Sequence, residues 1–324
     1  MRLLLVALLA AGLLPACAPT FAENGTLKIV FIDVEQGDSA LIIFPNEKTM
    51  LIDGGERNQD QTVLSILQEH GVTRIDVMVA THPHADHIGG LIGVIENVDV
   101  GQVMDSGQLY TTRTFEDLLD AIDTAQIPLF SVHEGDSINL DPAVELEVLN
   151  PPAALPEGID DELNNNSVVI KLTYGEFTAL FTGDMEEYSE QRLHTTNREA
   201  LDADVLKAGH HGSRTSSTDA FLHAVSPEVV IISAGADNTY GHPHQEVLDR
   251  IEAAGVQHVL RTDVDGAIIL TANGGSDYTL ETAESNKVVV VPEFEMAVLI
   301  VSVSLILPVV LMNGGRIWKW SRPA

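Results

Sequence analysis

Residues 81–90 read Thr-His-Pro-His-Ala-Asp-His-Ile-Gly-Gly, with three histidines and one aspartate inside six consecutive positions. The run follows a short apolar stretch at 75–80, which predicts a buried parallel strand. Pro83 and the pair Gly89-Gly90 argue against a continuous helix through the motif, so we expect its polar side chains to leave a loop at the strand end. Imidazole and carboxylate groups bind zinc and similar divalent ions, and the pattern therefore predicts a two-metal site.

Other histidines and a further aspartate also lie where predicted elements end. Asp184 closes a predicted hairpin at 167–184, and its carboxylate could bridge two metals about 3.5–4 Å apart. A Gly-His-His-Gly-Ser run at 209–213 follows a predicted strand, and Gly-His-Pro-His at 241–244 precedes a predicted helix. Seven of the twelve histidines lie in these two runs and the first motif, which is far from an even scatter.

A two-metal site restricts the reactions that the chain could perform. Two divalent ions lower the pKa of a bound water to about 7, so that hydroxide is available at neutral pH. This hydroxide would attack a phosphoryl or carbonyl centre. Lys207 and Arg214 flank the paired histidines and could stabilise an anionic group near the site. Lys207 could equally pair with an acid as an ordinary strand residue.

Strands and helices alternate around these motifs. The strands expected at 27–34, 39–45 and 49–55 are neighbours in one sheet, and the hairpin turns at 174–176. Further strands are predicted at 144–152, 203–209, 228–235 and in short pieces over 258–281. Helices are predicted at 61–71, 88–98, 115–125, 219–225 and 245–255.

Several motifs, taken in chain order, carry a family resemblance. THPHADHIGG, LIDGG, LFTGD and YGHPH resemble the metallo-β-lactamase superfamily. More narrowly, FIDVEQGDSALI, NNNSVVIKL, LKAGHHGS and YGHPHQEVL resemble the hydrolase domain of ComEC-type competence proteins and their stand-alone relatives, over residues 27–272. The resemblance implies an α/β fold, a four-layer αββα sandwich with a dinuclear metal site at the edges of its two sheets.

The resemblance also assigns ligands to individual residues. It implies a first metal on His82 and His84 and a second on Asp86 and His87, with two further ligands from the second half of the chain. These are a bridging Asp184 and, completing the second site, His242. The residues expected to take part in catalysis are Asp86, Lys207, His210 and His211. The paired histidines would bind an oxyanion or protonate the leaving group, and direct metal ligation by one of them is the alternative.

Other residues would support the ligands without binding metal. By resemblance, Asp53 lies beneath the metals and orients a ligand histidine, although an Asp-Gly turn is the structural alternative. The remaining supporting positions are Asp33, Gln36, Asp38, Asn166 and Ser213. Glu35 replaces the glycine that is usual in the narrower group.

One departure from the wider superfamily concerns the first metal. Where binuclear zinc hydrolases place a histidine before the strand that leads to the bridging aspartate, this chain has Asn164-Asn165-Asn166-Ser167. Asn166 could offer a carbonyl oxygen in its place. Oxygen-rich ligation favours harder ions, so the cofactors we expect are two divalent ions, zinc or manganese, with magnesium a further possibility.

Both ends of the chain predict export and membrane attachment. A signal peptide is predicted at 1–22, with a lipobox-like site that would make Cys17 a lipidated N-terminus. Cys17 is the only cysteine, so no intrachain disulfide is possible. The apolar stretch at 296–312 predicts a transmembrane helix, and a basic, tryptophan-containing tail at 313–324 predicts a cytoplasmic flank. Between them lie a domain at 26–283 and a linker at 284–295.

The charge of the chain bears on its partners. Acids outnumber bases by 48 to 17, for a net charge of −31. Tight binding of duplex nucleic acid requires lysine and arginine side chains that neutralise its phosphates. The net negative charge of the chain therefore argues against such binding. The sequence predicts a hydrolase at the outer face of the cell membrane, a phosphodiesterase or nuclease that acts on single strands. Hydrolysis of another ester, such as an envelope phosphodiester or a lactone, and a non-catalytic surface binding protein are the alternatives.

Overall fold

A computed structural model of the chain describes residues 25–154, 158, 162–284 and 288–291. The predicted signal peptide at 1–22, Cys17, the apolar stretch at 296–312 and the tail at 313–324 lie outside these residues. Within the described ranges, we find no helix with the length and apolar character needed to cross a bilayer.

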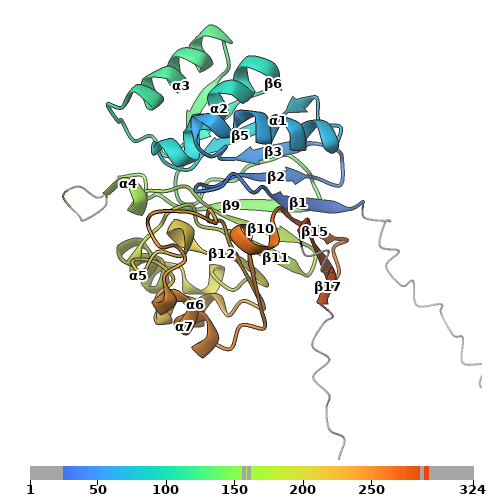
Figure 1. Cartoon of the computed structure of the whole chain (residues 1–324), viewed down its shortest axis with the longest axis vertical. Helices are drawn as coiled ribbons and strands as arrows, with labels where there is room; N and C mark the ends of the chain where they lie inside the picture. Colours follow the sequence, from blue (N-terminus) through green and yellow to red (C-terminus); the bar gives the residue numbers. More distant parts are fainter. Residues whose placement is uncertain (1–24, 155–157, 159–161, 285–287, 292–324) are drawn as a thin grey trace, which may run out of the picture. The chain divides into compact units, whose positions relative to one another are not determined.

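The larger sheet contains the strands at both ends of the described chain. Its described strands run in the order β17-β16-β15-β1-β2-β3-β5-β7-β8, with β1, β2 and β3 adjacent as predicted (Figure 1). The pairing is antiparallel from β17 to β3 and parallel from β3 to β8. In that order, the bounds are Val288–Val291, Tyr278–Thr282, Ile268–Ala272, Leu27–Phe31, Ala40–Ile43, Thr49–Ile52, Val77–Ala80, Val103–Asp105 and Leu129–Ser131.

The smaller sheet is built from one continuous part of the chain, between residues 144 and 261. Its order is β14-β13-β12-β11-β10-β9, and β11 to β14 are parallel. The predicted hairpin is confirmed, because β10 and β11 pair antiparallel around a turn at 175–176. The bounds are His258–Arg261, Val229–Ile232, Val205–Lys207, Phe177–Phe181, Val169–Tyr174 and Val144–Asn150; a separate short pair joins β4 (Arg74–Ile75) to β6 (Asp99–Val100).

Helices cover the outer face of each sheet, so the predicted αββα order of layers is confirmed (Figure 1). Strand β1 shows how the layers form. Ile29 and Phe31 point into the core between the sheets, whereas Val30 packs toward the helices, because side chains alternate along a strand. The helices on the larger sheet are α1 (Asp60–Glu69), α2 (Ala85–Asn97) and α3 (Arg113–Thr124); those on the smaller sheet are α5 (Glu187–Thr196), α6 (Asp219–Val225) and α7 (Gln245–Ala253).

Short helices and turns connect these layers. They are α4 (Glu162–Asn165), α8 (Thr262–Asp265) and the 3-10 turns η1 (Arg57–Gln59), η2 (Arg198–Ala200) and η3 (Gly209–Gly212). Strand β17 lies inside the stretch at 284–295 where the sequence predicted a linker, and it extends the larger sheet by pairing with β16.

Helix α2 begins three residues earlier than predicted, at Ala85, and therefore contains half of the first motif. The glycines do not break it. A Cβ on Gly90 would lie 2.0 Å from the carbonyl oxygen of Gly54, and one on Gly89 would lie 2.4 Å from the backbone nitrogen of Arg57. The two glycines thus let the helix approach the loop after β3. The expectation that the polar side chains of the motif leave a loop is wrong for Asp86 and His87, which lie in the first turn of α2, whereas His82 and His84 precede the helix.

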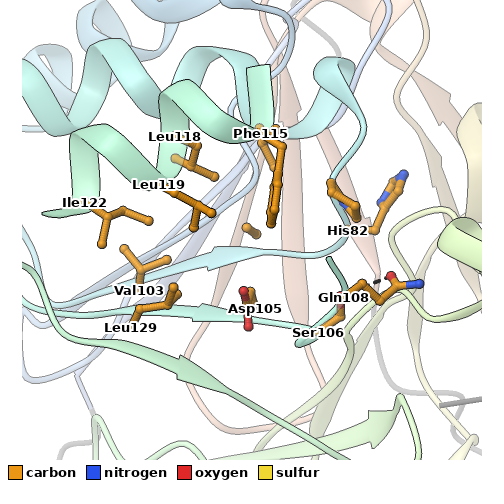
Figure 2. A pocket seen from close by; sticks show the side chains of 13 residues that line it. His82, Val103, Asp105, Ser106, Gln108, Phe115, Leu118, Leu119, Ile122 and Leu129 are labelled. Carbon is orange, nitrogen blue, oxygen red and sulfur yellow. Dashed lines mark hydrogen bonds between the residues drawn. The ribbon is translucent and has the colours of Figure 1, made fainter. Parts of the chain in front are cut away.

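Helix α3 packs next to the His/Asp motif, on the larger sheet. Phe115 and Leu118 pack there over β5 and β7, and the small space that remains reaches His82 (Figure 2). This space holds about 10 Å³, roughly the room that one water needs, so it belongs to the packing behind the histidine.

Candidate metal centre

The candidate site lies where parallel strands of both sheets end. The first motif follows β5, Asp184 follows β11, and the paired histidines follow β12. Ligands in open α/β sheets bind outside the carboxyl ends of parallel strands, because loops and helix N-termini converge there. The topology therefore brings residues from distant parts of the sequence to one place.

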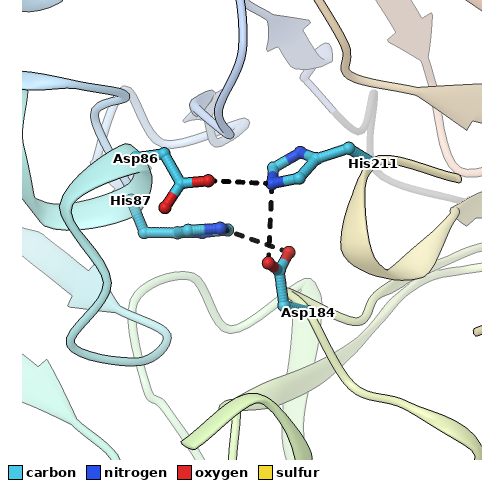
Figure 3. A group of neighbouring side chains, drawn as sticks. All are labelled: Asp86, His87, Asp184 and His211. Atoms are coloured by element: carbon cyan, nitrogen blue, oxygen red, sulfur yellow. Dashed lines mark ion pairs between the residues drawn. The ribbon is translucent and has the colours of Figure 1, made fainter. Parts of the chain in front are cut away.

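Asp86, His87, Asp184 and His211 form the core of the site (Figure 3). One ligand atom from each lies within 4.8 Å of the others. His87 Nε2 is 3.2 Å from Asp184 Oδ1, and His211 Nε2 is 3.3 Å from Asp86 Oδ2 and 3.5 Å from Asp184 Oδ2. Two of these residues come from the start of α2 and two from the smaller sheet.

His82 and His84 lie beside this cluster, and the ring centroids of His82 and His87 are 4.1 Å apart. His82 Nε2 is 3.8 Å from Asp184 Oδ2 and 3.0 Å from His84 Nδ1. Asp184 Oδ2 faces both His82 and His211, and Oδ1 faces His87. One carboxylate thus lies within reach of both groups of candidate ligands, as a residue shared by two cations would have to.

The chemistry of these atoms fits divalent cations. His87 Nε2, His211 Nε2 and Asp184 Oδ1 are buried and make no hydrogen bond within the described part of the chain. Such unpaired buried groups are costly unless a ligand satisfies them. Burial and the neighbouring His87 lower the pKa of both His82 and His84, which favours the neutral imidazole that binds metals.

The carboxylates and the remaining imidazoles of the cluster shift one another's pKa values through their charges. Although burial raises the pKa of Asp184, the adjacent His211 and His87 hold it well below its usual value. Burial opposes protonation of His87 and His211, but Asp184 outweighs it and raises the pKa of both, with help from Asp53 and Asp38 respectively. A cation would take the place of these protons.

Asp53 lies beneath His87 and fixes its ring. The Asp53 carboxylate accepts hydrogen bonds from His87 Nδ1 at 2.8 Å, from Thr81 N at 2.8 Å and from Thr81 Oγ1 at 2.7 Å. Its backbone has φ 57°, a left-handed conformation that is unusual for a residue other than glycine. The contact leaves His87 Nε2 directed at Asp184, and such outer contacts tune the basicity of a ligand imidazole.

Asp38 and Lys207 form a buried ion pair on the other side of His211. Lys207 Nζ lies 2.5 Å from Asp38 Oδ2, and His211 Nδ1 lies 3.2 Å from Asp38 Oδ1 and donates to the Ser233 carbonyl at 3.1 Å. Of the two interpretations of Lys207, the structure shows the pairing with an acid. Its ammonium group is buried and positions His211 through Asp38.

His210 and His211 point in different directions from one strained turn. Their φ angles are 48° and 53°, and each such left-handed residue costs about 1–3 kcal/mol. His211 is buried in the cluster, whereas His210 faces the cleft, with Nε2 3.8 Å from Asp184 Oδ2. Its Nδ1 donates to Glu186 Oε1 at 2.8 Å.

A cleft of about 490 Å³ opens over the cluster, and His242 lies on its wall. The His242 ring is 6.1 Å from that of His211 and 5.6 Å from that of His210, between centroids. It is not part of the four-residue cluster, in which His211 supplies the fourth ligand atom. Burial and the two neighbouring histidines lower the pKa of His242 to about 4, so its imidazole is neutral.

The remaining predicted residues differ in their distance from the cleft. Gln36 lines it and donates to His242 Nδ1 at 3.5 Å. Asn166 is fully buried, and neither its amide oxygen nor its nitrogen is paired within the described ranges. Ser213 contacts Thr215 at 3.0 Å, next to Glu186. Asp33 does not line the cleft and accepts a hydrogen bond from its neighbour Glu35.

Sequence reasoning missed three residues of the site. Glu186 binds His210, and the rings of Tyr110 and Tyr240 line the cleft. An acidic residue two positions after Asp184 was the available signal for Glu186, but nothing in the local pattern indicated that it would meet a histidine from another strand. The tyrosines lie in loops, where no periodicity marks the exposed face.

Comparisons with known proteins agree with this geometry. The model of the metallo-beta-lactamase superfamily matches residues 32–236. "ComE operon protein 3" of Bacillus subtilis is 30% identical over 267 residues, which are 77% of this chain and 33% of that protein. "Competence protein ComA" of Neisseria gonorrhoeae is 33% identical over 262 residues, 81% of this chain and 34% of that protein.

A solved structure, the metallo-beta-lactamase fold protein YhfI from Bacillus subtilis, aligns with a TM-score of 0.48 and 10% identity, over 76% of this chain and all of that one. The chain spans about a third of the length of the curated competence proteins that it matches. Family match, layer order and His/Asp cluster agree, and the chain belongs to the metallo-beta-lactamase superfamily.

Proposed function

We propose that the chain is a membrane-anchored, extracytoplasmic metal-dependent phosphodiesterase that accepts single-stranded nucleic acid or its fragments. The observation that carries this proposal is the cluster of Asp86, His87, Asp184 and His211, which lies under an open cleft. All but Asp86 contribute buried ligand atoms that have no hydrogen-bond partner among the described residues. His82 and His84 would hold one divalent cation with Asp184, and the four-residue cluster would hold the other. When bound, the two cations would polarise the ester and activate a water.

Other residues of the chain would orient the ligand rings or act on the substrate. Asp53 and the Asp38–Lys207 pair orient the ligand rings of His87 and His211. His210 is free to act on substrate, because its Nδ1 is held by Glu186 while its Nε2 faces the cleft. We assign it to the oxyanion or to the oxygen of the leaving group. In this assignment His211 is a metal ligand, and His242 binds substrate or completes the second site.

The similarity to competence proteins supports a phosphodiester or nucleic-acid substrate. One observation favours a different ester, such as a lactone: none of the residues that line the cleft is lysine or arginine. A non-catalytic binding protein is a poorer match, because the candidate ligand set is intact. The membrane location rests on the sequence patterns at 1–22 and 296–312.

The function can be tested with the full chain in detergent, freed of metal and reloaded with manganese or zinc. We expect release of p-nitrophenol from bis-p-nitrophenyl phosphate and little hydrolysis of a lactone. Asp86→Ala should abolish turnover and lower the bound metal, whereas Asp99→Ala, at an exposed aspartate of β6, should change neither. Failure of every reloaded sample to cleave the diester would refute the proposal, and cleavage of the lactone alone would identify the alternative.

Attachment to the outer membrane face needs a separate test. In intact cells, the domain should be accessible to added protease and should sediment with membranes. Removal of 296–324 together with Cys17→Ala should release it to the soluble fraction. A domain that is protected from protease in intact cells would contradict the proposed location.

A further inference from the structure

Tyr110 and Tyr240 line the cleft on the walls from the two sheets, and neither takes part in the proposed metal site. Tyr110 lies between β7 and α3 of the larger sheet, and Tyr240 lies between β13 and α7 of the smaller sheet. Both line the same cleft as Asp86 and His210. The catalytic cluster therefore lies between two aromatic rings that come from different halves of the chain.

Each tyrosine packs against a histidine of the site. The Tyr240 ring stacks on His242, with centroids 5.6 Å apart and planes inclined by 23°. The Tyr110 ring meets His84 edge-on, at 5.9 Å and 70°. Packing on His242 restrains the position of the Tyr240 ring and leaves most of that ring open, because 66% of the residue is exposed.

Burial does not account for Tyr240. The Tyr240 hydroxyl makes no hydrogen bond among the described residues, and the Tyr240 ring stacks on His242. A large aromatic side chain with this exposure gains little from folding. A rigid ring face at the mouth of a catalytic cleft is instead a surface on which another planar group can stack.

The charged residues around the cleft limit the kinds of contact that could hold a substrate there. Its lining includes the acids Glu56, Asp86 and Asp184 but neither lysine nor arginine. Arg214 is exposed and lies 3.8 Å from Glu246, and Lys207 is buried against Asp38. Apart from bound cations, the described cleft thus offers the substrate aromatic faces and imidazoles, and no ammonium or guanidinium group that could pair with further phosphates.

We propose that Tyr240 forms a stacking subsite for the unpaired base of a nucleotide whose phosphate lies at the metal cluster. This inference rests on the proposed function and narrows it, because it places recognition on one base beside the reacting phosphate. A base in a duplex is already stacked and paired, so the subsite selects single-stranded or short substrates. Stacking of a base on an aromatic ring is worth enough to change affinity at least about fivefold.

The test compares two ligands with the same sugar and phosphate, one with a base at C1′ and the other with a hydroxyl group there. Binding of thymidine 5′-phosphate and of deoxyribose 5-phosphate to the metal-loaded full chain is measured by equilibrium dialysis. We expect the thymidine compound to bind at least about fivefold more tightly. Tyr240→Ala should remove this preference and Tyr240→Phe should retain it, while the binding of deoxyribose 5-phosphate stays the same in all three proteins.

Tyr188 offers a matched control, because it is 44% exposed, lies on α5 and does not line the cleft. Tyr188→Ala should keep the full preference for the base. Equal binding of the two ligands by the unaltered protein, or a preference that survives in Tyr240→Ala, overturns the subsite. Hydrolysis of bis-p-nitrophenyl phosphate, measured in the same samples, shows whether the proposed function stands when the subsite fails.

Discussion

The two walls of the cleft are built in different ways. The wall from the larger sheet takes His84 and Asp86, with the buried His82 and His87 next to them, from six consecutive residues at the end of one strand and the start of one helix. The wall from the smaller sheet takes its groups from three separate strand ends, spread over 184–242. The first wall is a local motif, whereas the second exists only when strands β11, β12 and β13 lie side by side.

The walls also differ in how they are held. On the first, one buried aspartate, Asp53, fixes His87 from below. On the second, Glu186 holds His210, the Asp38–Lys207 pair holds His211, and Glu190 accepts from the backbone nitrogens of Ser217 and Thr218 in the following loop. The second wall, which is assembled from distant segments, is thus fixed by more acidic contacts than the first.

The largest effect should come from Asp184, the residue that the two proposed metals would share. Asp184→Asn keeps the size of the side chain but removes its charge, so we expect loss of both cations and a fall in turnover of at least about a thousandfold. Metal content and diester hydrolysis measure this. Retention of two metals per chain would show that the walls bind their cations separately.

The stability of the second wall should depend on pH through Glu190. Burial raises its pKa to about 7, so the folded state favours the neutral carboxyl. The unfolded group titrates near its usual value of 4.5, and stability is therefore full below that pH and declines as pH rises toward 7, by about 3 kcal/mol. Glu190→Gln should lack this decline in denaturant unfolding of the metal-free chain at pH 4.5 and 7.5. Parallel pH curves for the two proteins would contradict the assignment.

Loss of the support under the first wall should weaken metal binding without emptying the site. Asp53→Asn cannot accept the same three hydrogen bonds as a carboxylate, and we expect metal affinity to fall about 10- to 100-fold. Competition with a chelator gives the affinity. An unchanged affinity would mean that packing alone orients His87.

The corresponding change on the second wall should act on turnover instead. Glu186→Gln leaves His210 without its carboxylate partner, so we expect turnover to fall about tenfold and metal affinity to stay the same. If His210 protonates the departing oxygen, one of its two proposed roles, the loss should be greater for esters with poor leaving groups than for p-nitrophenyl esters. A loss of metal would assign Glu186 to the metal site itself, and an equal loss for all esters would assign His210 to the oxyanion in place of the leaving group.

Much of the first wall could be predicted from the sequence. The His/Asp motif, the strand before it and the neighbouring strands β1 to β3 follow local rules, since side-chain period and strand length are set by nearby residues. The start of α2 was misjudged, because Gly89 and Gly90 meet the loop after β3, a contact made by residues distant in the sequence. Strand β17 was likewise missed, because its place depends on pairing with β16.

The sequence by itself determined the family, the types of ligand and the clusters from which they come, because these are properties of short segments. Only the tertiary structure decided that His211 joins the four-residue cluster while His242 lies outside it on the cleft wall, that Lys207 faces Asp38, and that Glu186 holds His210. Two adjacent histidines have the same chemistry, and a left-handed turn, which depends on its surroundings, sends one into the cluster and the other into the cleft.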